Sequence, residues 1–153
     1  MFRFRPLTQA DAEEVARWHY PEPYSFYDWI ADQDDFEELL DPESRGDAYA
    51  AVLDDQGEVV GFFSSKPKGT GLVEVGLGLR PDHTGRGLGL AFVEAGLEEA
   101  RARHAPERFT LAVAAFNKRA ITIYERAGFE EVRRYQHHTN GADWDFVEMQ
   151  RPA

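Results

Sequence analysis

A glycine-rich segment, Thr84-Gly85-Arg86-Gly87-Leu88-Gly89, lies between a strand-like and a helix-like stretch and is well suited to bind a ligand. Glycines at such a junction let several backbone N–H groups turn toward one point. The N-terminus of the following helix adds a partial positive charge there, and Arg86 adds a cation. The segment, continued by Leu90, therefore predicts a diphosphate-binding site.

Spacing excludes the two commonest nucleotide-binding patterns for this segment. A dinucleotide-binding loop has glycine at its first, third and sixth positions, but counting from Gly85 the sixth residue is Leu90. A Walker loop ends in Gly-Lys-Ser or Gly-Lys-Thr, and this segment has neither the lysine nor the hydroxyl. Taken alone, the segment also fits a glycine-rich turn that binds nothing.

A second segment, Asn117–Phe129, combines helix punctuation with a possible proton donor. Asn117 suits an N-cap and Gly128 suits the position just after a helix. Tyr124 lies between them, and a phenol of ordinary acidity stays protonated at neutral pH, so it can supply a proton. Core packing one turn from Ala120 is the alternative role for Tyr124.

The strand-like stretch Thr70–Leu79 carries a carboxylate and two glycines on one face. Alternation places Glu74 with Gly76 and Gly78, opposite a row of apolar residues. Glycines weaken a strand unless something must approach its backbone closely. We expect Glu74 to act as a general base through a water molecule. An ion-paired or solvent-facing residue is the alternative, and the rival bases are His137, His138, Asp143 and Asp145.

The two segments together resemble the GNAT superfamily of N-acyltransferases. In that family Gln or Arg, two residues, Gly, one residue, and Gly or Ala bind the pyrophosphate of acyl-CoA; Gly87 and Gly89 match the two small positions. Thr84 stands where the family carries Gln or Arg, so Arg80 or Arg86 would have to supply the charge. The second segment resembles the family's Asn-x-x-Ala…Tyr…Gly-Phe stretch.

The resemblance implies an acetyl-CoA-dependent N-acetyltransferase that needs no metal. It assigns the pyrophosphate to Thr84–Leu90, pairing with the pantetheine arm to Leu77, Gly78 and Leu79, a further contact to Asn117, and protonation of the leaving thiolate to Tyr124. The acceptor would be a primary amine of a small molecule or peptide. An acyl-CoA-binding module without turnover is the alternative function. Many relatives are dimers, which makes a homodimer possible.

The elements that must position these residues follow an order of strand, two helices, three strands, helix, strand, helix and two strands. Thr8 and Asp11 form a capping-box pattern before the first helix. By resemblance the fold is α/β (α+β), with a mixed, mostly antiparallel sheet of six to seven strands. About four helices would flank it, and it would splay between strands four and five. The aromatic segment Trp18–Trp29 would either shape the acceptor pocket or pack in the core.

Composition restricts the class of protein. A chain of 153 residues with 42% hydrophobic residues predicts one folded domain spanning 1–153. The formal net charge of −11 disfavours nucleic-acid binding and favours a cationic partner such as a free amine, although it also fits a merely solubilising surface. Cysteine is absent, which removes disulfides and thiolate chemistry. No membrane span or signal peptide is discernible, so we expect a cytoplasmic protein.

Overall fold

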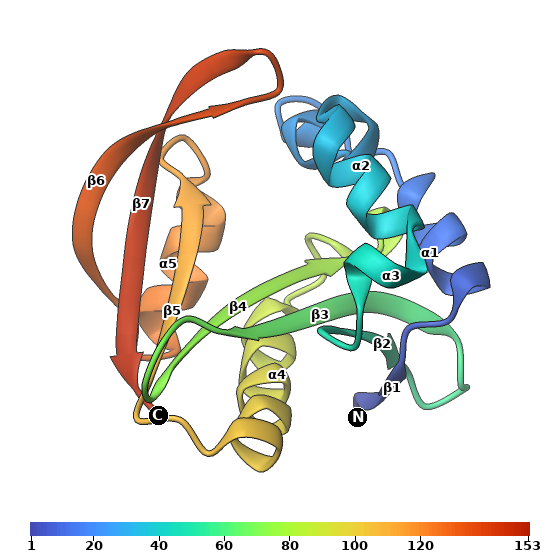
Figure 1. The fold of residues 1–153 in the computed structure, drawn as a ribbon, viewed down its shortest axis with the longest axis horizontal. Helices are drawn as coiled ribbons and strands as arrows, with labels where there is room; N and C mark the ends of the chain where they lie inside the picture. The colour runs from blue at the N-terminus through green and yellow to red at the C-terminus, as the bar shows by residue number, and fades with distance from the viewer.

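The computed structural model describes residues 1–153, which form a seven-stranded sheet with five α-helices (Figure 1). The strands are β1 (Arg3–Pro6), β2 (Tyr49–Leu53), β3 (Val59–Pro67), β4 (Leu72–Leu79), β5 (Arg108–Ala114), β6 (Glu130–Thr139) and β7 (Ala142–Pro152). The helices are α1 (Gln9–Ala16), α2 (Gln33–Leu40), α3 (Pro42–Arg45), α4 (Gly89–His104) and α5 (Lys118–Arg126). Short 3-10 turns cover η1 (Tyr24–Tyr27), η2 (Trp29–Ala31) and η3 (Pro81–His83).

The sheet is mixed and has the order β1-β2-β3-β4-β5-β7-β6. Every neighbouring pair is antiparallel except β4 and β5, which are parallel and pair only from Leu72–Arg108 to Glu74–Thr110. Beyond that point the two strands separate, and the sheet opens into the V seen in Figure 1. The predicted strand number and the splay between strands four and five are confirmed.

The two faces of the sheet carry two separate cores. Adjacent residues of β2 illustrate this, because Ala51 and Val52 are both fully buried yet point to opposite faces. Val52 belongs to the larger core, which packs the sheet against α4, with α5 at its margin. Ala51 belongs to a smaller core beneath α1 and α2. Helices α4 and α5 therefore cover one face of the sheet, and the α1–α3 segment lies on the other (Figure 1).

Local signals set most element boundaries as the sequence predicts. Thr8 forms a complete capping box with Asp11, and the Asn117 side chain accepts a hydrogen bond from Ala120 N–H at the start of α5. The helix count differs from the expected four because a short α3 follows α2. Asp41 caps α3 through Glu43 N–H, and Pro42 at its first position suits a helix start, so the pair that ends α2 also begins α3.

No helix of this chain combines the length and the apolar character needed to cross a bilayer.

Candidate active site

The V between β4 and β5, here called the wedge, exposes unpaired backbone along both strands. Arg80 N–H donates to Val60 O on β3, so alternation turns the backbone groups of Leu79, Leu77 and Val75 toward β5 instead. On β5, Ala115 N–H donates to Asp145 O on β7, which turns Ala114 toward β4. An extended group carrying amides could pair with these edges as an additional strand does.

The two glycines of β4 have a different role from the one inferred from sequence. A Cβ at Gly78 would lie 2.5 Å from the Phe62 ring, and a Cβ at Gly76 would lie 2.7 Å from Ser64 Oγ. Side chains of β3 therefore make the close approach that the two glycines predict, and no ligand is needed to account for it. The backbone N–H and C=O of Gly78 point toward Phe62 on β3, whereas those of Leu77 and Leu79 point into the wedge.

The predicted diphosphate loop follows the open end of β4, between η3 and α4. Gly85 and Gly87 have φ of +73° and +76°, a conformation that favours glycine. No side chain caps the N-terminus of α4, so its first N–H groups are left for a ligand. An anion is the ligand that such a helix end binds best.

Neither expected arginine provides the loop with a cation. Arg80 pairs with Asp82 at 2.7 Å and donates to Val59 O at 3.1 Å, away from the cavity described below. Arg86 is exposed and lies outside the cavity lining, and Thr84 Oγ1 donates to Pro81 O at 2.7 Å. The missing side-chain charge is therefore not replaced from within the loop.

A cavity of about 830 Å³ runs from this loop through the wedge. Of the residues predicted to bind the cosubstrate, those on its wall are Leu77, Gly78, Leu79, Thr84, Gly85, Gly87, Leu88, Gly89, Leu90 and Asn117. Tyr124 is on the same wall, whereas Arg86 and Glu74 are not. The structure thus brings together nearly the whole predicted set, drawn from β4, the loop and α5.

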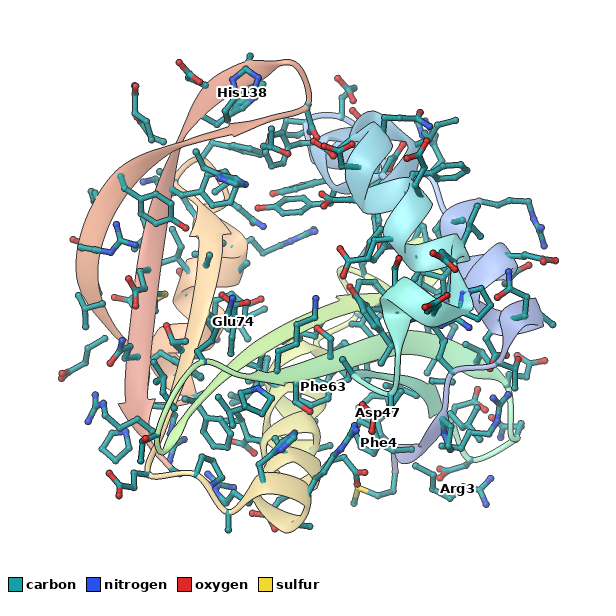
Figure 2. The ribbon with its side chains drawn as sticks, in the orientation of Figure 1. Arg3, Phe4, Asp47, Phe63, Glu74 and His138 are labelled. Carbon is teal, nitrogen blue, oxygen red and sulfur yellow. The ribbon has the colours of Figure 1, made fainter.

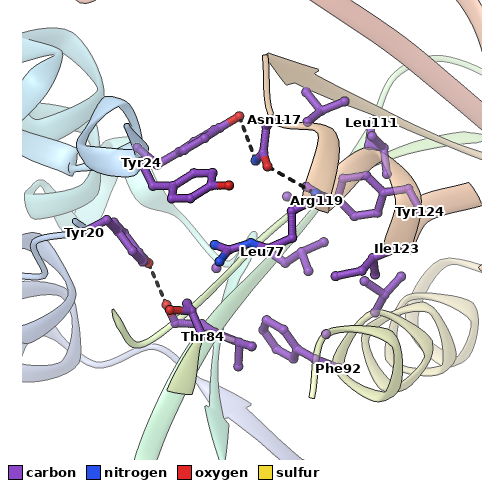
Figure 3. Close-up of a pocket in the computed structure, with 18 of the residues that line it drawn as sticks. Tyr20, Tyr24, Leu77, Thr84, Phe92, Leu111, Asn117, Arg119, Ile123 and Tyr124 are labelled. Atoms are coloured by element: carbon purple, nitrogen blue, oxygen red, sulfur yellow. Dashed lines mark hydrogen bonds between the residues drawn. The ribbon is translucent and has the colours of Figure 1, made fainter. Parts of the chain in front are cut away.

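Tyr124 reaches the cavity from the middle of α5, and its hydroxyl makes no hydrogen bond within the chain (Figure 3). Burial raises the pKa of Tyr124 above that of an ordinary phenol, with a smaller contribution from nearby Tyr27. The hydroxyl therefore keeps its proton throughout the neutral range. The Asn117 side chain is less available for the predicted contact with the cosubstrate, because its Oδ1 caps α5 and its Nδ2 donates to Tyr27.

Three tyrosines between α1 and α2 close one side of the wedge, and we call the segment Tyr20–Tyr27 the tyrosine strap. Tyr20 donates its hydroxyl to Leu79 O at 2.7 Å, which takes up the last carbonyl of β4. Tyr27 oxygen accepts from Ala114 N–H at 3.3 Å and from Asn117 Nδ2 at 3.2 Å. Burial raises the pKa of both Tyr20 and Tyr27, so both phenols stay neutral. The strap joins the ends of the two separated strands.

A second connection across the wedge joins the α2 side to the tip of the β6–β7 hairpin, and we call it the Asp32 clasp. Asp32, the N-cap of α2, accepts from Thr139 Oγ1 at 2.9 Å and from Asn140 N–H at 3.1 Å. Asn140 Nδ2 donates to Phe26 O at 2.9 Å. These bonds, led by the one from Asn140 N–H, lower the pKa of Asp32. The clasp holds the hairpin tip near α2, as Figure 1 shows.

The predicted bases occupy very different places. Glu74 lies on the paired part of β4, opposite Thr110, with its carboxylate 3.6 Å from Lys68 Nζ and outside the cavity wall (Figure 2). Its predicted role as base therefore gains no support from the geometry. His138 is exposed near the hairpin tip and pairs with Asp143 at 2.9 Å, and Asp145 is exposed.

His137 is the one candidate base on the cavity wall. Its ring packs edge-on against Phe146, with ring centroids 5.0 Å apart. Across the cavity lies Asp35 of α2, whose pKa is raised by burial and by the neighbouring charges of Asp32 and Glu38, while His137 opposes that shift. Aromatic rings line this end as well, from Phe26, Trp29, Tyr49, Phe62 and Phe146. The aromatic segment thus shapes the cavity while also packing against the core.

Sequence reasoning missed the strap, the clasp and Arg119 on α5, which also lines the cavity. The strap tyrosines lie within the aromatic segment Trp18–Trp29, but Pro21 and Pro23 keep Tyr20 out of a helix, so no periodicity relates the three residues. The clasp joins residues more than a hundred positions apart, and no local pattern reports such a contact.

Comparison with known proteins agrees with this geometry. A family model described as an acetyltransferase (GNAT) domain matches residues 2–130. The mycothiol acetyltransferase of Streptomyces avermitilis is 37% identical over 114 residues, covering 72% of this chain and 35% of that protein. That of Saccharomonospora viridis is 31% identical over 134 residues, covering 76% and 42%. The chain thus spans about a third to two fifths of the length of these relatives.

Solved structures share the fold at low sequence identity. The spermidine N-acetyltransferase of Vibrio cholerae, in a complex with CoA and spermine, superposes with a TM-score of 0.79 at 20% identity, covering 99% of this chain and 95% of that one. The family model extends from β1 to the start of β6 and includes both the loop and α5. This chain therefore belongs to the GNAT family of acetyltransferase domains.

Proposed function

We propose that residues 1–153 form a single acetyltransferase domain that transfers the acetyl group of acetyl-CoA to a primary amine. The observation that carries the proposal is one continuous cavity, which joins an uncapped helix N-terminus, an unpaired strand edge and a protonated phenol. The chemistry of these groups matches the diphosphate, the amide-bearing arm and the departing thiolate of acetyl-CoA. Family membership supports the same assignment.

The residues of the cavity divide the proposed reaction among them. N–H groups of β4 on the wedge edge, including that of Leu77, polarise the acetyl carbonyl as an amine attacks it. His137 accepts the proton that the amine loses, since an imidazole suits proton transfer near neutral pH. Tyr124 donates its proton to the thiolate as the carbon–sulfur bond breaks. Its raised pKa keeps that proton on Tyr124 before attack, and the phenolate left by the transfer regains a proton from water before the next turnover.

The acceptor end of the cavity supports a cationic amine as substrate. Aromatic rings there can stack on the apolar body or the cation of an acceptor. The Asp35 carboxylate has no hydrogen-bonding or ionic partner within the chain, and its neighbours Asp32 and Glu38 carry the same charge. A cationic group bound beside Asp35 would relieve this repulsion. Spermidine, named for the Vibrio cholerae relative, belongs in the test panel for this reason.

Binding and turnover are tested separately. Acetyl-CoA should raise the Tm of the protein, while ATP and NAD should leave it unchanged. Release of free thiol from acetyl-CoA is then measured against a panel of monoamines, diamines and peptide N-termini. Turnover with at least one amine supports the enzyme. Binding without turnover across the whole panel would instead support an acyl-CoA-binding module, and a response to ATP or NAD alone would support a nucleotide-binding protein.

A Tyr124→Phe variant tests the proposed acid. Removing the hydroxyl should lower kcat by about 100-fold, the lower end of what general acid catalysis contributes, while the Kd for acetyl-CoA stays within about threefold. The control is Tyr135→Phe, whose hydroxyl lies on β6 outside the cavity wall. Equal kcat values for Tyr124→Phe and the wild type would remove Tyr124 from the mechanism.

A further inference from the structure

The cavity contains a cation that the family motif does not place. We propose that Arg119, in the first turn of α5, supplies the side-chain charge for the diphosphate of acetyl-CoA. It would replace the Gln or Arg that the motif carries at the position of Thr84. The inference rests on the proposed function, because it concerns how the same cosubstrate is bound.

The loop itself leaves this charge to another element. Thr84 directs its hydroxyl to Pro81 O, and Arg80 is held by Asp82 and by the Val59 carbonyl. Arg86 lies outside the cavity wall. Backbone N–H groups alone would then face two phosphate charges. A guanidinium binds phosphate oxygens through two parallel hydrogen bonds, so an arginine nearby is the residue type expected to complete the site.

Helix packing brings α5 against the loop. A Cβ added to Gly89, the first residue of α4, would lie 2.6 Å from Ile123 Cδ1, so the start of α4 contacts the middle of α5 directly. Residues four positions before and three after Ile123 share its helix face. These are Arg119 and Arg126, and both lie on the cavity wall. The anion site at the start of α4 is thus flanked by two cations from α5.

Of these two arginines, Arg119 is the one that contacts the tyrosine strap. Its guanidinium carbon lies 4.2 Å from the centre of the Tyr24 ring on the tyrosine strap, as Figure 3 shows. It forms no salt bridge or hydrogen bond within the chain, so its donors are free for a ligand. Arg126 lies in the last turn of α5, where the helix C-terminus already favours a cation. Stacking on Tyr24 holds Arg119 extended without consuming its donors.

The test compares acetyl-CoA binding by titration calorimetry at low salt for the wild type and three variants. Arg119→Gln should raise the Kd about tenfold, the loss of about 1.4 kcal/mol expected for one solvent-accessible guanidinium–phosphate contact. Arg86→Gln, outside the cavity wall, and Arg134→Gln, on β6, remove one charge each from the same molecule and should change the Kd less than threefold. The difference between Arg119→Gln and the wild type should shrink as salt rises. Equal effects of all three substitutions would reduce the role of Arg119 to bulk charge and overturn the proposal.

Shortened ligands identify the phosphate concerned. Acetyl-dephospho-CoA lacks the 3′-phosphate but keeps the diphosphate, so Arg119→Gln should weaken its binding by the same factor as for acetyl-CoA. Acetyl-pantetheine lacks both groups, and the variant should bind it as the wild type does. If the effect disappears with acetyl-dephospho-CoA, Arg119 contacts the 3′-phosphate and the assignment to the diphosphate is wrong.

Two further outcomes separate this inference from its premise. If the wild type does not bind acetyl-CoA, the proposed function fails before Arg119 is tested. If the wild type binds and Arg119→Gln binds equally well, only the role of Arg119 fails. A Tyr24→Leu variant removes the stacking ring but leaves the guanidinium, and it should bind acetyl-CoA within threefold of the wild type. A loss in Tyr24→Leu combined with unchanged binding by Arg119→Gln would assign the effect to the ring and overturn phosphate binding by Arg119.

Discussion

Replacing Tyr27 with phenylalanine removes one oxygen atom from the point where the tyrosine strap meets β5. That oxygen accepts from Ala114 N–H and from Asn117 Nδ2, and Asn117 is only 8% exposed. The Tyr27→Phe variant leaves both donors without this partner. A net loss of about 1 kcal/mol for each hydrogen bond gives about 2 kcal/mol of lost stability. In a chain of this size that corresponds to a fall in Tm of about 4–8 °C.

Thermal unfolding followed by circular dichroism measures this change, and Tyr24→Phe provides the matched control. The Tyr24 hydroxyl makes no hydrogen bond, and its ring would still stack on Arg119, so that variant should melt within 1 °C of the wild type. We also expect Tyr27→Phe to lower kcat, because Asn117 caps the helix that carries Tyr124. A Tm for Tyr27→Phe equal to that of Tyr24→Phe would show that water replaces the phenol without cost and that the strap does not fix β5.

Three further predictions concern other parts of the chain. Gly96→Ala should lower stability by about 1–2 kcal/mol despite better helix propensity, because its Cβ would lie 2.5 Å from the buried Phe63 ring, and chemical denaturation measures this. His137→Gln should lower kcat/KM at least tenfold whereas Glu74→Gln should leave it nearly unchanged, and the opposite result would restore Glu74 as base. Asp32→Ala should lower the Tm by about 2–4 °C at pH 7. Since the folded protein lowers the pKa of Asp32 from 3.8, that difference should vanish as the pH falls through this lowered pKa; persistence once Asp32 is protonated would exclude a charge-dependent clasp.

The fold was largely predictable because its signals are local. The Thr8 capping box, the Asn117 cap and the positive φ of Gly128 each act within a few residues. Resemblance then supplied the mixed, mostly antiparallel sheet and its splay, which no local pattern contains. The short α3 was missed because Asp41-Pro42 ends one helix and begins another with the same two residues.

The site was predictable where backbone performs the function and less so where side chains do. The loop at Gly85 and Gly87 works through main-chain geometry, which glycine spacing reveals. The cation did not follow from the loop sequence, because Arg119 comes from a helix that only tertiary packing brings beside Gly89. Alternation placed Glu74 on the correct face of β4 but could not show that β5 still pairs with it there. The position of Glu74 along β4, within the part that still pairs with β5, is what keeps it out of the cavity wall.

The strap and the proposed cosubstrate have the same structural role in the wedge, because both supply partners for its unpaired backbone groups. Two strands that separate leave N–H and C=O groups that must find partners in protein, water or ligand. Tyr20 takes the carbonyl of Leu79, and Tyr27 takes the N–H of Ala114, so the strap satisfies the open ends of both strands. The carbonyl of Val75 and both backbone groups of Leu77 remain free between the strap and the last paired residue, Glu74. That interval is about one two-residue repeat of a strand, long enough to pair with a short run of amides and too short for a folded segment. The strap thereby limits what the wedge can bind to a narrow, extended arm.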